Sequence, residues 1–142
     1  MIGKSRRQEY PSTRSLIDKL GVKPEAKVTV IGVQDEAFWL QLGERTHDIV
    51  VGRLRKECDV VFFAADSLSD LKKLAPLKTY LVDNGAIWVV SLKGKAAKIK
   101  DVDVIAAAKA AGLVDNKVVS FSETHTALRL VIPVSKRASH GT

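Results

Sequence analysis

The sequence predicts an α/β domain in which a mostly parallel sheet lies between two layers of helices. Strand-like and helix-like segments alternate along the chain, which favours this class. The strand-like segments are nearly continuous runs of β-branched and other apolar residues, typical of parallel strands buried on both faces. The chain has 142 residues, of which 46% are hydrophobic, so one domain can bury a sufficient core without a disulfide or metal.

The first half of the chain is expected to contain two helices and three strands. Ser12 is a suitable N-cap for the first helix, and Gly21 ends it. The second helix ends at Gly43 and turns three apolar side chains inward, Ala37, Phe38 and Leu42. In chain order, the expected ranges are 13–20 (helix), 27–32 (strand), 35–42 (helix), 47–52 (strand) and 58–65 (strand).

The second half is expected to contain two helices and three strands. Asp66 or Ser67 can cap the third helix, which Pro76 should kink or split because proline lacks a backbone N–H. Residues 83–85 (DNG) are expected to form a turn, and Gly112 follows the last helix. The final two strands suit an antiparallel hairpin. The expected ranges are 66–81 (helix), 86–92 (strand), 103–112 (helix), 117–122 (strand) and 126–132 (strand).

The α/β domain is predicted to span residues 10–133, between a flexible basic arm at 1–9 and a disordered tail at 134–142. No apolar run approaches the ~18 residues of a membrane helix. The basic start lacks the apolar segment of a signal peptide. Cys58 is the only cysteine, so no internal disulfide can form. These features predict a cytoplasmic protein without membrane association.

Net charge is +7, with 23 Lys and Arg against 16 Asp and Glu. Basic residues follow the second and fourth strands, and the carboxyl ends of parallel strands share one edge of a sheet. They are therefore candidates for an anion-binding rim, with a solvated basic surface as the alternative. The candidate anion-binding residues are Arg53, Arg55, Lys56, Lys93 and Lys95.

No catalytic residue and no metal site is assigned from the sequence. His47, His125 and His140 are scattered, and a single cysteine leaves no zinc-binding set. His125 lies near Glu123 in the expected hairpin turn, where side chains usually face solvent. Trp39 either packs simply against the domain or contributes to a partner or dimer surface.

Several segments carry a family resemblance. LGVKP, DVVFF, DNGAIWVVSLK and AAKAAGLVDNKVVSF resemble parts of class I S-adenosylmethionine (SAM)-dependent methyltransferases. STRSLIDKLGVKPEAKV, WVVSLKGK and AAGLVDNKVVSFSETHTALRLV are similar to a family of short uncharacterised bacterial proteins, domain-of-unknown-function family 3052. The resemblance implies a reduced, three-layer Rossmann-like sheet of six strands in the order 2-1-3-4-6-5. Strand 6 would run antiparallel between strands 4 and 5.

In such a sheet, a ligand would lie beyond the carboxyl ends of strands 1 and 3, at the switch point. The resemblance places four residues there as candidate cofactor-binding positions, Gly32, Val33, Gln34 and Asp66. However, the loop after strand 1 has only one glycine, and Asp35 adds negative charge. Arg53 stands near the end of strand 2, where a methyltransferase carries an acid for the ribose hydroxyls; arginine can only donate.

These departures favour a non-catalytic protein that needs no cofactor and binds a protein partner or a small anionic ligand, as a monomer or homodimer. Two alternatives remain at this stage. The protein is a SAM- or nucleoside-dependent enzyme of small molecules, or it associates with nucleic acid through its basic residues.

Overall fold

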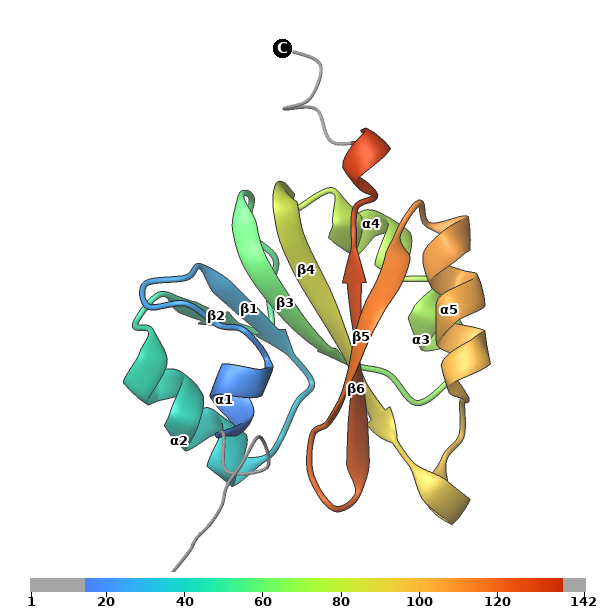
Figure 1. The fold of residues 1–142 in the computed structure, drawn as a ribbon, viewed down its shortest axis with the longest axis horizontal. Coiled ribbons are helices and arrows are strands. Elements are labelled where there is room, and N and C mark those ends of the chain that lie inside the picture. Colours follow the sequence, from blue (N-terminus) through green and yellow to red (C-terminus); the bar gives the residue numbers. More distant parts are fainter. Residues whose placement is uncertain (1–14, 137–142) are drawn as a thin grey trace, which may run out of the picture.

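The computed structural model describes residues 15–136, so the expected basic arm and residues 137–142 lie outside the described part. The strands form one six-stranded sheet in the order β2-β1-β3-β4-β6-β5, and β6 is antiparallel to both of its neighbours (Figure 1). Both features confirm the expected topology. The strands are β1 (Val28–Ile31), β2 (Ile49–Val51), β3 (Cys58–Ala64), β4 (Leu81–Leu92), β5 (Val114–Ser120) and β6 (His125–Val131).

Helices cover both faces of the sheet, which makes the three expected layers (Figure 1). One face carries α1 (Leu16–Lys19) and α2 (Glu36–Arg45). The other carries α3 (Leu68–Leu71), α4 (Leu74–Lys78) and α5 (Asp101–Ala110). Short 3-10 helices, η3 (Gly94–Ala96) and η4 (Val134–Lys136), follow β4 and β6.

Alternating side chains of the central strands build two separate cores. Phe62 and Trp88 face α1 and α2, whereas Phe63 faces the opposite helices, as the period of two requires. All three are buried. The indole Nε1 of Trp88 donates to the carbonyl of Leu20, 3.2 Å away, so α1 is fixed to the sheet by a buried hydrogen bond.

The expectations that rest on glycine and proline positions are confirmed only in part. Helix α2 continues through Gly43 to Arg45, and Ala37 is exposed, so these two expectations are wrong. The helix ends instead where Thr46 takes up an extended backbone. The expected split near Pro76 is confirmed: α3 and α4 separate at residues 72–73, because proline has no N–H and would collide with the carbonyl four residues earlier.

Several element boundaries differ from the expected ones. Strand β4 starts at Leu81 and includes residues 83–85, which were expected to be a turn. Ser15 caps α1, and the expected cap Ser12 lies outside the described residues. Ser67, rather than Asp66, caps α3. Helix α5 begins at Asp101, two residues early, and ends before Gly112 as expected. Within residues 15–136, no helix has the length and apolar character needed to cross a membrane.

Candidate functional site

A cavity of about 280 Å³ lies at the carboxyl ends of β1, β3 and β4, which is the switch point of the sheet. The four residues expected to hold a cofactor all line it; their role in binding stays a prediction. The turn between β5 and β6 closes the cavity from the other side. Its lining residues are Gly32, Val33, Gln34, Asp35, Ala64, Asp66, Val90, Phe121, Thr124 and His125.

The loop after β1 forms the floor of the cavity. Gly32 has a φ of +78°, a conformation that favours glycine, and a Cβ there would lie 3.3 Å from the Cβ of Ala64. Val33 is only 6% exposed because its side chain belongs to the core beneath α2. Its bulk therefore points into the core, and the exposed side chain of this loop is that of Gln34.

Helix α2 holds this loop in place through two hydrogen bonds. Asp35 caps the helix, because its Oδ1 accepts from the backbone N–H of Phe38 at 2.9 Å. The indole Nε1 of Trp39 donates to the carbonyl of Val33 at 3.1 Å. Trp39 is half-buried against the core, so it packs within the domain and also fixes the cavity floor.

The loop after β3 supplies Asp66, whose side chain is exposed at the cavity. A reciprocal capping arrangement holds it: Ser67 Oγ accepts from the N–H of Asp70 at 3.0 Å. In return, Asp70 Oδ2 accepts from the N–H of Asp66 at 3.0 Å. This backbone hydrogen bond is the main cause that lowers the pKa of Asp70 below its ordinary value of 3.8.

Replacing Asp70 by asparagine is expected to destabilise the protein at neutral pH by less than about 1 kcal/mol, because the carboxyl is partly exposed. A lowered folded-state pKa means that the ionised form stabilises the fold above the ordinary value of 3.8. That contribution is lost as the pH falls through the folded-state pKa. Urea denaturation of both proteins from neutral to acidic pH should show the difference shrinking below this value; a difference that grows there would contradict the assignment.

The hairpin turn between β5 and β6 brings in residues that the sequence alone does not place at the site. His125 Nδ1 lies 2.8 Å from Thr124 Oγ1, and Ser122 Oγ accepts from the N–H of His125 at 3.1 Å. Phe121 is 5% exposed and forms an apolar wall. The antiparallel direction of β6 could have predicted their place at the site, because it turns this hairpin towards the carboxyl ends of β1 and β3.

The five basic candidate residues are spread over both edges of the sheet. Arg55 forms an ion pair with Asp48 and donates to the carbonyl of Val28, the first residue of β1, at the opposite edge from the cavity. The Nζ of Lys56 lies 5.2 Å from the ring centroid of Tyr80, just before β4. These two residues therefore do not join a rim with Lys93.

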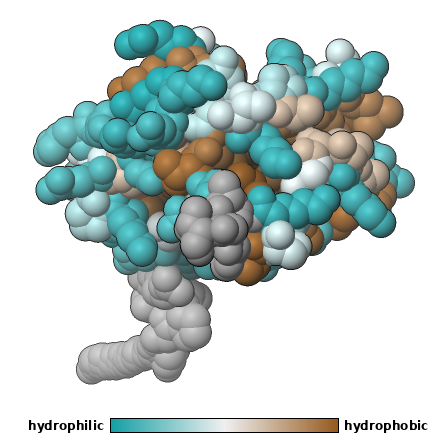
Figure 2. All heavy atoms as spheres, turned by 90° about the horizontal axis from the view of Figure 1, so that it is seen from above, coloured by the Kyte–Doolittle hydropathy of each residue, from teal (hydrophilic) through white to brown (hydrophobic). Residues whose placement is uncertain are grey.

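Lys93 lies next to the cavity. Its N–H donates to the carbonyl of Thr124 at 3.0 Å, and its Nζ donates to Ser120 Oγ at 2.8 Å. Arg53 is exposed in the loop after β2, and Lys95 is exposed in η3. Figure 2, seen from above the view of Figure 1, likewise shows hydrophilic residues distributed widely, with hydrophobic residues between them. Anion binding by the five residues stays a prediction.

The cavity combines hydrogen-bond acceptors with an apolar wall. Asp35 and Asp66 contribute carboxylates and His125 an imidazole, whereas no lysine or arginine of residues 15–136 lines the space. Carboxylates accept hydrogen bonds from ammonium, amide and hydroxyl donors. Among the described residues, no group of three or more His, Cys, Asp and Glu side chains could hold a metal ion. The arrangement suits a small ligand that carries donors.

The strand order and the helices on both faces of the sheet define a Rossmann-like domain with a methyltransferase-like fold. The chain belongs to the family of proteins of unknown function DUF3052, whose profile matches residues 17–134. A search of curated proteins gave no significant match.

Solved structures with this fold include SAM-dependent methyltransferases. Magnesium protoporphyrin IX methyltransferase from Synechocystis PCC 6803, with bound SAM, is 11% identical, with a TM-score of 0.61 over 82% of this chain and 74% of that one. A SAM-dependent methyltransferase from Aquifex aeolicus is 13% identical, with a TM-score of 0.57 over 82% of this chain and 88% of that one. At these identities the similarity shows the fold alone.

Proposed function

We propose that this protein is a non-catalytic binding domain that holds a small ligand in the cavity at the switch point. The observation that carries the proposal is the lining of that cavity. The cavity lies at the position where sheets of this architecture bind ligands. Its side chains offer acceptors from Asp35, Asp66 and His125, whereas the segment directly after β2 provides no carboxylate for the ribose hydroxyls of an adenosyl cofactor.

The residues present fit SAM poorly. Strand β2 ends at Val51 and is followed by Gly52 and Arg53, so no carboxylate stands there to accept from the ribose hydroxyls. The connection from β2 to β3, residues 52–57, contains neither helix nor strand. The cavity, at about 280 Å³, is slightly smaller than the ~300–1,000 Å³ of sites that bury drug-sized ligands. The missing carboxylate after β2 therefore favours a ligand other than SAM.

The charge of the site indicates the chemistry of this ligand. A cationic or donor-rich group would lie against Asp35 and Asp66, which offset its lost hydration. An anionic group on the same ligand would be met at the rim by Lys93, the basic residue whose contacts place it beside Thr124. This combination refines the anionic ligand expected from the sequence into a small molecule with both donors and an anionic end.

Thermal unfolding with a panel of probes tests the proposal. The probes are SAM, its demethylated product, adenosine, putrescine, inorganic phosphate and a mixture of free amino acids. A ligand at 100 times its dissociation constant adds about 2.7 kcal/mol of stability, which is a shift of several degrees for a domain of this size. We expect a shift with a small donor-bearing probe and none with SAM.

Matched variants locate the binding. Asp66→Ala should remove the shift, because this exposed carboxylate lines the cavity. Glu44→Ala removes an exposed carboxylate from α2, away from the cavity lining, and should leave the shift unchanged. A SAM-dependent shift that Asp66→Ala abolishes would overturn the proposal. No shift with any probe at millimolar concentration would count against a ligand site altogether.

Two other functions have weaker support. A SAM- or nucleoside-dependent enzyme is favoured by the fold, since a solved structure of similar topology carries bound SAM. Nucleic-acid association is favoured by the net charge of +7 alone, and its signature would be binding that falls steeply with salt.

A further inference from the structure

Helix α5 is apolar on nearly all sides, although one side faces solvent. Val104 and Ala108 are buried against the sheet. On the outer side, Val102 is 67% and Ile105 37% exposed, and Leu68 of the neighbouring α3 is 62% exposed. A helix that is hydrophobic all round is normally buried, and grouped exposed apolar residues mark an interaction surface.

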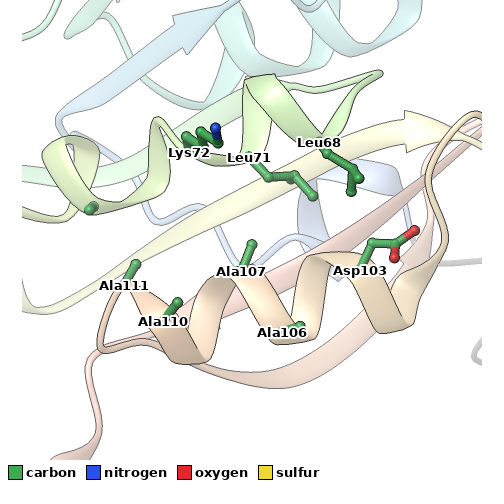
Figure 3. Close-up of a pocket in the computed structure, with 9 residues that line it drawn as sticks. Leu68, Leu71, Lys72, Asp103, Ala106, Ala107, Ala110 and Ala111 are labelled. Carbon is green, nitrogen blue, oxygen red and sulfur yellow. The ribbon is translucent and has the colours of Figure 1, made fainter.

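A groove of about 440 Å³ runs between α5 and the α3–α4 pair. Figure 3 shows Leu68 beside Asp103 at one end of the groove, and Lys72 towards Ala111 at the other. Its floor consists mainly of small side chains, Ala75, Ala106, Ala107, Ala110 and Ala111. The groove borders the solvent-facing side of α5 at Ala106 and Ala110, whose small side chains leave room for another helix to approach closely.

The exposed side of α5 carries two ridges of residues spaced by four. One ridge is Asp101, Ile105 and Lys109, and the other is Val102, Ala106 and Ala110. Ridges with this spacing are the ones that interdigitate in the commonest class of helix packing. The first ridge carries an acidic, an apolar and a basic residue in that order. When a second copy of the helix runs in the opposite direction, the acidic residue of each copy therefore lies opposite the basic residue of the other.

We propose that this surface is covered by a second copy of the same chain, with the two α5 helices antiparallel about a two-fold axis near Ile105 and Ala106. Under that symmetry, Asp101 of each copy faces Lys109 of the other. Ile105 fits above the small Ala106, and the two helix dipoles oppose each other favourably.

The charge pattern of one helix alone is also favourable, since acids stabilise a helix N-terminus and lysines its C-terminus. That effect does not explain why Val102 and Ile105 are exposed on the same solvent-facing side of α5. A second copy accounts for both the apolar cover and the charges. The surface lies on the opposite face of the sheet from α2 and does not depend on the proposed ligand.

The oligomeric state in solution tests this inference directly. A contact made mainly by one helix from each copy is expected to be small and weak, so sedimentation velocity should be measured from about 1 to about 500 µM. We expect a concentration-dependent dimer. Ile105→Asp should give a monomer throughout that range. Leu40→Asp is the matched control, because Leu40 is 66% exposed on α2 of the other face, and this variant should dimerise like the wild type.

A charge swap distinguishes the antiparallel pairing from general stickiness. Asp101→Lys and Lys109→Glu each place like charges opposite one another and should weaken the dimer at least about tenfold. The double variant restores opposite charges and should recover most of that loss. Far-UV circular dichroism confirms that each variant is folded. A wild type that is monomeric at all concentrations, or a double variant no better than the single ones, would overturn the proposal.

Discussion

Replacing Phe38 by alanine is expected to destabilise the protein by about 3–5 kcal/mol, the usual cost of removing a fully buried phenylalanine. Phe38 is 0% exposed at the start of α2. Its ring centroid lies 4.8 Å from that of Phe62 on β3 and 5.0 Å from that of Phe121 after β5. The substitution therefore removes the side chain that joins α2, the sheet and the hairpin turn, and leaves a cavity between them.

Urea denaturation monitored by circular dichroism measures this effect. Leu40→Ala on the same helix is the control, because Leu40 is 66% exposed and its truncation should change stability by no more than about 0.5 kcal/mol. Phe38→Leu should cost less than Phe38→Ala, since it keeps most of the buried volume. A loss below about 1 kcal/mol for Phe38→Ala would mean that α2 does not depend on this contact.

The substitution should also affect the site. Phe121 is both a neighbour of Phe38 and a wall of the cavity, and Asp35 caps the helix on which Phe38 lies. Ligand binding in the Phe38→Ala protein is therefore expected to weaken even at temperatures where the protein remains folded. Packing of the core beneath α2 is therefore coupled to ligand binding in the cavity above Gly32.

The strands could be predicted from the sequence because a strand that is buried on both faces consists almost entirely of apolar residues. Residues 58–64, for example, are almost entirely apolar, and they form the central β3. The order of the strands was not accessible in the same way: alternation gives the fold class, whereas the 2-1-3-4-6-5 order came from the family resemblance. The structure confirms that order.

The site could be predicted only in part. Gly32 and Asp66 follow two neighbouring parallel strands, so their place at one edge was inferable from position alone. His125 was missed because its local sequence resembles any solvated turn, and only the direction of β6 brings it to the cavity. Arg55 follows β2 in the sequence and was therefore expected at the same edge as the cavity. Its long side chain instead reaches Asp48 and Val28 at the other edge.

Gly85 shows how one residue type can be interpreted wrongly, and it gives the second prediction with a large effect. The sequence DNG indicates a turn, but Gly85 is a buried residue within β4. Opposite it, the pairing of β3 with β4 shifts from Cys58–Leu81 to Val60–Ala86, which is a bulge. A Cβ on Gly85 would lie 2.9 Å from the carbonyl oxygen of Asp59 and 3.1 Å from that of Cys58.

Gly85→Ala is therefore expected to destabilise the protein by about 1–3 kcal/mol, because backbone oxygens of the central sheet must shift to make room. Gly43→Ala is the matched control: Gly43 lies inside α2 with open space around it, so the same substitution should stabilise by about 0.5–1 kcal/mol. Equilibrium urea denaturation of both variants should show these opposite signs. A neutral or stabilising effect of Gly85→Ala would mean that glycine has no steric role at the bulge and that β3 and β4 do not approach each other closely there.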